Sequence, residues 1–157
     1  MDACDELGLF VIVNTPGWQF WNEAPIFAER VYSDIRNMVR RDRNHPSVWM
    51  WEPILNETWY PAEFAKNVVN ILKEEYPYPY CYAGCDVTAL GHEYFPVQFT
   101  HPLNGMGGAF NTDKLDPNIS YFTREWGDNV DDWNSHNSPS RVNRGWGEVP
   151  MLVQAQG

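Results

Sequence analysis

Two glutamates occupy positions where a scaffold can present carboxyl groups to a substrate: Glu57 in SVWMWEPILNET and Glu125 in ISYFTREWGD. Each follows an apolar run too short for a helix and precedes polar residues typical of turns. Such a pair can cleave a glycosidic bond, because one carboxyl donates a proton to the leaving oxygen while the other attacks the anomeric carbon or activates water. The alternative is that both are solvated loop acids among the 21 acidic residues.

Aromatic residues are unusually frequent, with eight Trp, eight Tyr and eight Phe. Several of these rings stand beside polar residues: Trp18, Trp59, Trp126, Trp133 and Trp146. An indole ring can stack on the C–H face of a sugar, although core packing accounts for most aromatic residues in most proteins. We therefore expect a ligand role for only a few of them.

Composition excludes several classes of partner. The chain of 157 residues has 11 basic and 21 acidic residues and a net charge of −10, which disfavours nucleic acid and anionic membrane surfaces. No apolar run reaches the roughly 20 residues of a membrane span, and no leader pattern opens the chain. Cys4, Cys81 and Cys85 are interpreted as buried free thiols, and a metal at the last two is the weaker alternative. The run GDNVDD is interpreted as a solvated acidic turn rather than a calcium loop.

The elements that must position the glutamates alternate along the chain. Short apolar runs predict strands, and apolar residues spaced three and four apart predict amphipathic helices. The predicted strands are residues 9–13, 47–51, 80–83, 97–100 and 119–123, and the predicted helices are residues 2–7, 26–41 and 61–72. This order is typical of a parallel α/β fold. A (β/α)8 TIM barrel takes about 250 residues, so the chain is predicted to be an incomplete barrel with two unpaired strand edges.

The sequence resembles the catalytic barrel of glycoside hydrolase family 2, the family of β-galactosidases, β-glucuronidases and β-mannosidases. The resemblance rests on DACDELGLFVIVNTPG, DIRNMVRRDRNHPSVWMW, the Asn56-Glu57 pair and TREWGD. In this family an Arg-Asp-Arg/Lys-Asn-His-Pro-Ser-Val run leads into the fourth strand, and residues 41–48 reproduce it. The resemblance implies that residues 1–157 cover about the third strand to the helix after the seventh, without the first, second and eighth strands.

The resemblance also implies individual roles. Glu57 matches the general acid/base, Asn56 the residue that hydrogen-bonds the sugar 2-hydroxyl, and Glu125 the nucleophile. The family retains anomeric configuration, so the two carboxyls are expected about 5–5.5 Å apart. Partial burial against Trp49, Trp51 or Trp59 and the negative charge of Glu125 would keep Glu57 protonated. Arg124, Arg36 or a backbone donor would keep Glu125 ionised.

Four further residues are predicted substrate contacts: Trp18, Asp86, His101 and Trp126. For His101 a structural role is the alternative. Val13-Asn14-Thr15 stands where many relatives carry an acidic pair, and VQFTHP offers Thr100 and His101 where the sixth strand often supplies a Tyr. These two departures leave the specificity open, whereas Trp126 in place of the common Tyr is a mild change. Glu52 is the rival of Glu57 for the acid role, but it precedes Pro53 and follows no Asn.

We therefore expect a retaining β-glycosidase that releases terminal β-linked sugars by double displacement. The β-galactosidase-like choice rests on how common that activity is in the family, and β-glucuronidase or β-mannosidase is the alternative. Two further alternatives are an inactive fragment and a non-catalytic carbohydrate-binding module. The expected partners are a carbohydrate substrate and the remaining domains of the parent chain, without nucleic acid, membrane, cofactor or metal. A homo-oligomer and the cellular location stay open.

Overall fold

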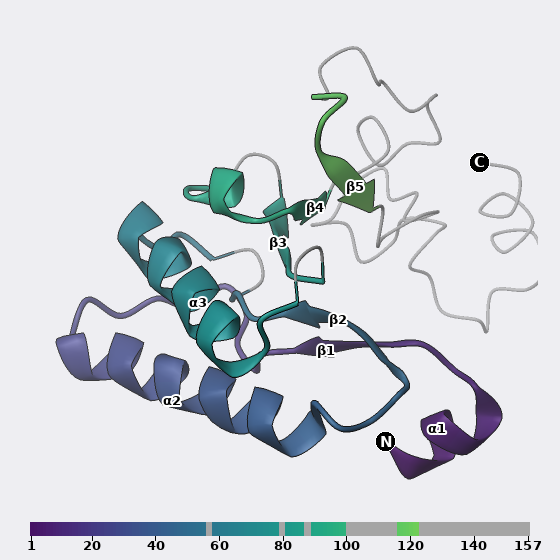
Figure 1. Cartoon of the computed structure of the whole chain (residues 1–157). Coiled ribbons are helices and arrows are strands. Elements are labelled where there is room, and N and C mark those ends of the chain that lie inside the picture. Colours follow the sequence, from purple (N-terminus) through teal and green to yellow (C-terminus); the bar gives the residue numbers. More distant parts are fainter. Residues whose placement is uncertain (56–57, 79–80, 87–88, 100–115, 123–157) are drawn as a thin grey trace, which may run out of the picture. The chain divides into compact units, whose positions relative to one another are not determined.

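The computed structural model describes residues 1–55, 58–78, 81–86, 89–99 and 116–122 (Figure 1). Residues 1–99 together with 119–121 form one compact unit, which contains the elements that follow apart from Phe122, the last residue of β5. In chain order the helices are α1 (Asp2–Leu7), α2 (Pro25–Asp42), α3 (Ala62–Glu75) and the short 3₁₀ helix η1 (His92–Tyr94). The strands are β1 (Val11–Asn14), β2 (Val48–Glu52), β3 (Ala83–Asp86), β4 (Val97–Phe99) and β5 (Ser120–Phe122).

Within each sheet the strands lie in their sequence order. β1 pairs in parallel with β2, and β3 pairs in parallel with β4, beside which β5 lies. A parallel bridge between Trp51 and Tyr82 connects the two pairs, and the backbone N–H of Trp51 donates to the carbonyl of Cys81 at 2.8 Å. The long helices α2 and α3 are the connections between successive strands (Figure 1). This order confirms the α/β class and the alternation predicted from sequence.

The helices begin and end close to where the sequence predicts. α1 stops at Gly8, which adopts the left-handed conformation with a φ of 69°. Pro25 is the first residue of α2, a position where its missing N–H costs nothing. Pro61 lies one residue further out than predicted, because it caps α3 in an extended conformation rather than opening it.

The hydrophobic core lies between one face of the sheet and the two long helices. Val13 and Trp51 are buried in this core together with Ile35 of α2 and Val68 of α3. Trp51 is fully buried, and the centroid of its ring lies 5.6 Å from that of Tyr76. Because side chains alternate along a strand, the residues after Val13 and Trp51 belong to the opposite face. The sheet therefore has a helix-covered face and a second face that carries Asn14 and Glu52.

The register of the β1–β2 pair shifts by one residue, and this shift keeps two apolar residues of β2 on the helix-covered face. Val11 lies opposite Val48, but Ile12 lies opposite Met50, so Trp49 is an extra residue in β2. A bulge of this kind changes which face each later residue occupies. It allows both Val48 and Trp51 to pack on the helix side, while Trp49 keeps 47% of its surface exposed.

Two strand predictions were wrong in detail. β1 was expected from Leu9 with both faces buried, yet Leu9 and Phe10 lie before it and are 54% and 78% exposed. Within the described part of the chain β1 has a strand neighbour on one side only, which explains this exposure. β3 lies about three residues later than expected, so Asp86 is its last residue rather than a residue beyond it.

Candidate active site

Polar residues gather where the first strands end. β1 ends at Asn14, β2 at Glu52 and β3 at Asp86. The carboxyl ends of parallel strands meet at one edge of a sheet, and this edge carries the substrate site in α/β barrels. Of the predicted site residues, Asp86 thus stands at the expected edge, and its side chain lies outside the description.

Asn14 and Glu52 form the best-defined contact at this edge. They are register partners in the β1–β2 pair, and the Asn14 amide donates a hydrogen bond to the Glu52 carboxylate. The strand pairing continues one residue further, where the N–H of Thr15 donates to the Glu52 carbonyl at 3.0 Å. Glu52 is only 3% exposed, whereas Asn14 is exposed. Sequence marked Glu52 as a strand-end carboxyl, but its contact with Asn14 depends on a register that sequence does not reveal.

The loop after β1 packs against the segment that leads to Asn56 and Glu57. Gly17 has a φ of 141°, and a Cβ atom at this position would lie 2.5 Å from Cδ2 of Leu55. Leu55 itself is buried, at 2% exposure. The absence of a side chain at Gly17 therefore lets the two loops approach closely at the carboxyl edge. Trp18, the predicted sugar contact, follows in this loop and is 63% exposed.

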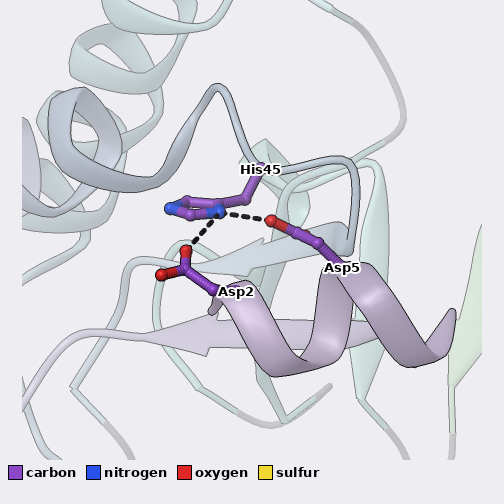
Figure 2. A group of neighbouring side chains, drawn as sticks. All are labelled: Asp2, Asp5 and His45. Atoms are coloured by element: carbon purple, nitrogen blue, oxygen red, sulfur yellow. Dashed lines mark hydrogen bonds and ion pairs between the residues drawn. The ribbon is translucent and has the colours of Figure 1, made fainter.

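The run at residues 41–48 contributes a structural brace. In Figure 2, Asp5 of α1 faces His45, and their Oδ2 and Nδ1 atoms lie 2.6 Å apart. The second oxygen of Asp5 accepts the backbone N–H of Ser47 at 3.0 Å. Hydrogen bonding from Ser47, followed by that from His45, lowers the pKa of Asp5 to about 2. This contact fixes the turn that feeds β2, and thereby the strand that leads to Glu57.

Asp2 joins this group at its exposed side. Its Oδ1 lies 3.9 Å from Nδ1 of His45, and the ligand atoms of Asp2, Asp5 and His45 lie within 4.8 Å of one another (Figure 2). These residue types can hold a divalent metal ion. Asp5 already accepts from Ser47 and contacts His45, however, so the group is accounted for as a structural brace.

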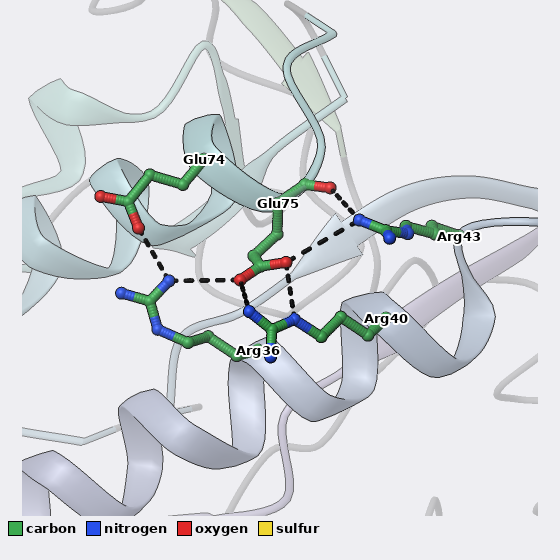
Figure 3. Close-up of polar contacts among 5 residues, drawn as sticks. All are labelled: Arg36, Arg40, Arg43, Glu74 and Glu75. Carbon is green, nitrogen blue, oxygen red and sulfur yellow. Dashed lines mark hydrogen bonds and ion pairs between the residues drawn. The ribbon is translucent and has the colours of Figure 1, made fainter.

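A second polar cluster joins α2 to α3 on the helix side of the sheet. Glu75 accepts from Arg40 at 2.8 Å and from Arg36 at 3.4 Å, and its carbonyl accepts from Arg43 at 3.0 Å (Figure 3). Hydrogen bonding from Arg40 is the main cause that lowers the pKa of Glu75. Arg36 also pairs with Glu74 at 2.8 Å. Arg36 thus pairs with two carboxylates of α3, whereas Glu125, its other expected partner, lies outside the described residues.

The remaining predicted site residues lie outside the described residues. These are Asn56, Glu57, His101, Glu125 and Trp126. The described residues nearest to Glu57 in sequence, Leu55 and Thr58, are both buried. Among the rings expected to bury Glu57, Trp51 lies in the helix-side core and Trp59 is 87% exposed.

Two other sequence interpretations can be placed. Cys4 and Cys81 are free thiols, half-buried rather than fully buried, and Cys85 lies outside the description of side chains. Burial raises the pKa of Cys81 to about 11, which keeps this sulfur protonated. Among the described residues, no helix has both the length and the apolarity that crossing a membrane requires.

Comparison with known proteins gives consistent matches. Residues 1–78 match the family model described as glycosyl hydrolases family 2, TIM barrel domain. The chain is 36% identical over 74 residues to a beta-galactosidase of Thermoanaerobacterium thermosulfurigenes, an alignment covering 47% of this chain and 10% of that protein. It is 35% identical over 133 residues to beta-mannosidase B of Aspergillus clavatus, covering 75% of this chain and 15% of that protein.

A solved structure agrees with these relatives. The GH2 beta-galacturonidase from Eisenbergiella tayi, bound to galacturonate, superposes with a TM-score of 0.57 and 25% identity. The match covers 68% of this chain and 21% of the galacturonidase chain. The present chain thus spans only 10% and 15% of the two curated relatives named above.

Proposed function

Because this chain belongs to glycosyl hydrolase family 2, and residues 1–78 to its TIM barrel domain, we propose that it carries both catalytic carboxyls of a retaining β-glycosidase. Glu57 is the general acid/base and Glu125 is the nucleophile. The observation that carries this proposal is the parallel strand edge at β1 and β2, to which the Asn56-Glu57 segment is attached. Family members that match the chain include a beta-galactosidase and a beta-mannosidase, both of which are glycosidases by name.

The reaction proceeds in two displacements. Glu125 attacks the anomeric carbon while Glu57 gives its proton to the leaving oxygen, and a glycosyl ester forms on Glu125. The charge of Glu125 vanishes in this ester, so the pKa of Glu57 falls and Glu57 can deprotonate the attacking water. Asn56 orients the sugar by hydrogen bonding its 2-hydroxyl.

The substrate class is a terminal β-linked sugar, and a β-galactoside is the first choice. The names of the matched relatives divide between galactose, mannose and galacturonate. The family match is therefore more informative about the type of bond cleaved than about the sugar. A panel of aryl β-glycosides with different glycosyl groups decides among them.

The test compares the chain alone with the chain inside a complete barrel. The complete barrel is a longer protein that contains residues 1–157 together with the remaining strands, for example a homologous barrel whose matching segment has been replaced. We expect it to release the aryl group from one or more β-glycosides. Glu57→Gln and Glu125→Gln should each lower kcat by at least about a hundredfold, since each removes a group that acts in the transition state.

A control variant and two alternative outcomes complete the test. Glu63→Gln changes a carboxyl in the first turn of α3 and should leave turnover unchanged, because α3 covers the opposite face of the sheet. Sugar binding without turnover in the complete barrel, unaffected by either catalytic substitution, would establish a carbohydrate-binding module instead. Turnover by the complete barrel but not by the chain alone would show that the sugar contacts need the other strands.

A further inference from the structure

The contact between Asn14 and Glu52 lies at the strand edge proposed to carry the substrate, and the double displacement uses neither residue. Their strand neighbours Val13 and Trp51 face the helices. Asn14 and Glu52, one residue further on, therefore lie on the opposite face, which becomes the interior in a closed barrel. Both stand at the carboxyl ends of their strands. This is the place where side chains reach a bound sugar.

The chemistry of the pair fixes which way the Asn14 amide is turned. The Asn14 nitrogen is the donor and a Glu52 carboxyl oxygen is the acceptor, so the Asn14 nitrogen faces Glu52. The Asn14 oxygen and the second amide hydrogen are then turned away from Glu52. Asn14 is exposed, whereas Glu52 is 3% exposed, so a ligand at this edge can reach the amide more readily than the carboxyl group behind it.

We propose that Asn14 is a substrate-binding residue that hydrogen-bonds a hydroxyl group of the terminal sugar, with Glu52 as the positioning residue that orients its amide. The proposal rests on the proposed glycosidase function. An exposed carboxamide with an acceptor and a second donor turned outward matches a sugar hydroxyl, which can donate and accept.

The proposal gives Glu52 a role different from the acid role considered from sequence. A carboxyl that is buried and hydrogen-bonded to a neighbouring strand end is suited to orienting a partner. Glu57 remains the proposed acid. Substitution of Glu52 should therefore weaken substrate binding through Asn14, rather than abolish the chemical step as substitution of Glu57 should.

The experiment uses the complete barrel and monodeoxy versions of its best aryl β-glycoside, each lacking one sugar hydroxyl. Asn14→Ala should raise KM about tenfold for the parent substrate with little change in kcat, as expected for one lost hydrogen bond. For one monodeoxy substrate the same substitution should cost nothing, because the partner hydroxyl is already gone. Asn70→Ala, at an exposed asparagine on α3, is the matched control and should change neither constant.

Two substitutions of Glu52 test its positioning role. Glu52→Met removes the acceptor but keeps an unbranched side chain of similar length. Like Asn14→Ala, this variant should no longer distinguish the parent substrate from the monodeoxy substrate that lacks the partner hydroxyl. Glu52→Gln keeps one acceptor oxygen and should retain most of that discrimination. Should Glu52→Met fail to fold, the monodeoxy pattern of Asn14→Ala still decides the binding claim, since Asn14 is exposed.

The outcomes distinguish this inference from the function on which it rests. One contrary result is that Asn14→Ala raises KM equally for the parent and every monodeoxy substrate, and another is that it raises KM for none of them. Either result would contradict the role of Asn14 in binding a hydroxyl group, but not the glycosidase function. A complete barrel that turns over no β-glycoside, although it is folded, would overturn the proposed function itself.

Discussion

Single residues in this chain divide between those that brace the strands and those that stand at the proposed substrate edge. His45, in the most recognisable run of the sequence, contacts Asp5 of α1. Sequence could identify this run as a family feature, but it could not assign the brace. The two residues are 40 positions apart, and only the fold brings α1 beside the turn before β2.

The brace predicts a specific dependence of stability on pH. The pKa of Asp5 is about 2 in the folded chain, below its ordinary value of 3.8. A lowered folded-state pKa means that the unfolded chain takes up the proton first, so the contribution of Asp5 is present above about pH 4 and is lost as the pH falls towards 2. Thermal unfolding of the complete barrel between about pH 2 and pH 6 should show a flatter low-pH decline for Asp5→Asn than for the unaltered chain. Parallel curves would mean that the brace contributes nothing.

Gly17 is expected to tolerate no side chain. A Cβ atom there would lie 2.5 Å from the buried Leu55, and the φ of 141° is unfavourable for other residues. Gly17→Ala should destabilise the fold by about 1–3 kcal/mol and raise KM, because the loop that carries Trp18 is pushed from its place. Gly8→Ala is the control, since Gly8 also has a positive φ but nothing lies within 4 Å of the place its Cβ atom would take. Equal effects at the two glycines, in unfolding midpoint and KM, would contradict the crowding at Leu55.

At the scale of elements, helix periodicity was the most reliable guide. Apolar spacing located α2 and α3 to within about a turn, because a helix that covers a sheet must present one continuous apolar face. Strands are short and their limits depend on neighbours, so β3 lay later than its apolar run suggested. The bulge at Trp49 was also beyond prediction, because it is a property of two paired strands rather than of one.

The two helices are held together by Glu75 as well as by apolar packing. Glu75 is 9% exposed and lies among Arg36, Arg40 and Arg43, whose own side chains are 34–57% exposed. Glu75→Gln should cost about 1–2 kcal/mol of stability, reduced from the value for a fully buried pair because the arginines reach solvent. Glu74→Gln removes an exposed pair with Arg36 and should cost less than about 0.5 kcal/mol.

Unfolding midpoints of both variants at low and high salt check this difference. The difference in unfolding midpoint between Glu75→Gln and Glu74→Gln should persist in high salt, since salt screens exposed ion pairs more strongly than half-buried ones. Variants of equal stability would show that the cluster in Figure 3 lies on the surface of the helix pair without joining it.

At the scale of the whole molecule, the described strands provide part of the proposed substrate edge. Asn14, Glu52 and Asp86 end three successive strands. The family match and the alternation of strands and helices could be predicted from the sequence, because both depend on local patterns. The distance between the carboxyls of Glu57 and Glu125 does not follow from local patterns, since it depends on how strands from distant parts of the chain are arranged in a barrel. That spacing remains the central prediction.

Covalent labelling of the nucleophile tests this prediction most directly, because a glycosyl ester forms only in the retaining arrangement, in which the two carboxyls lie about 5–5.5 Å apart. A 2-deoxy-2-fluoro β-glycoside with a good leaving group forms the glycosyl ester, and its electron-withdrawing fluorine slows the hydrolysis that follows. Mass spectrometry of the complete barrel should then find one added glycosyl group on the peptide that contains Glu125. The label should be absent in Glu125→Gln. Turnover of the parent glycoside accompanied by a label on another residue, or with inversion of the anomeric configuration, would contradict the account.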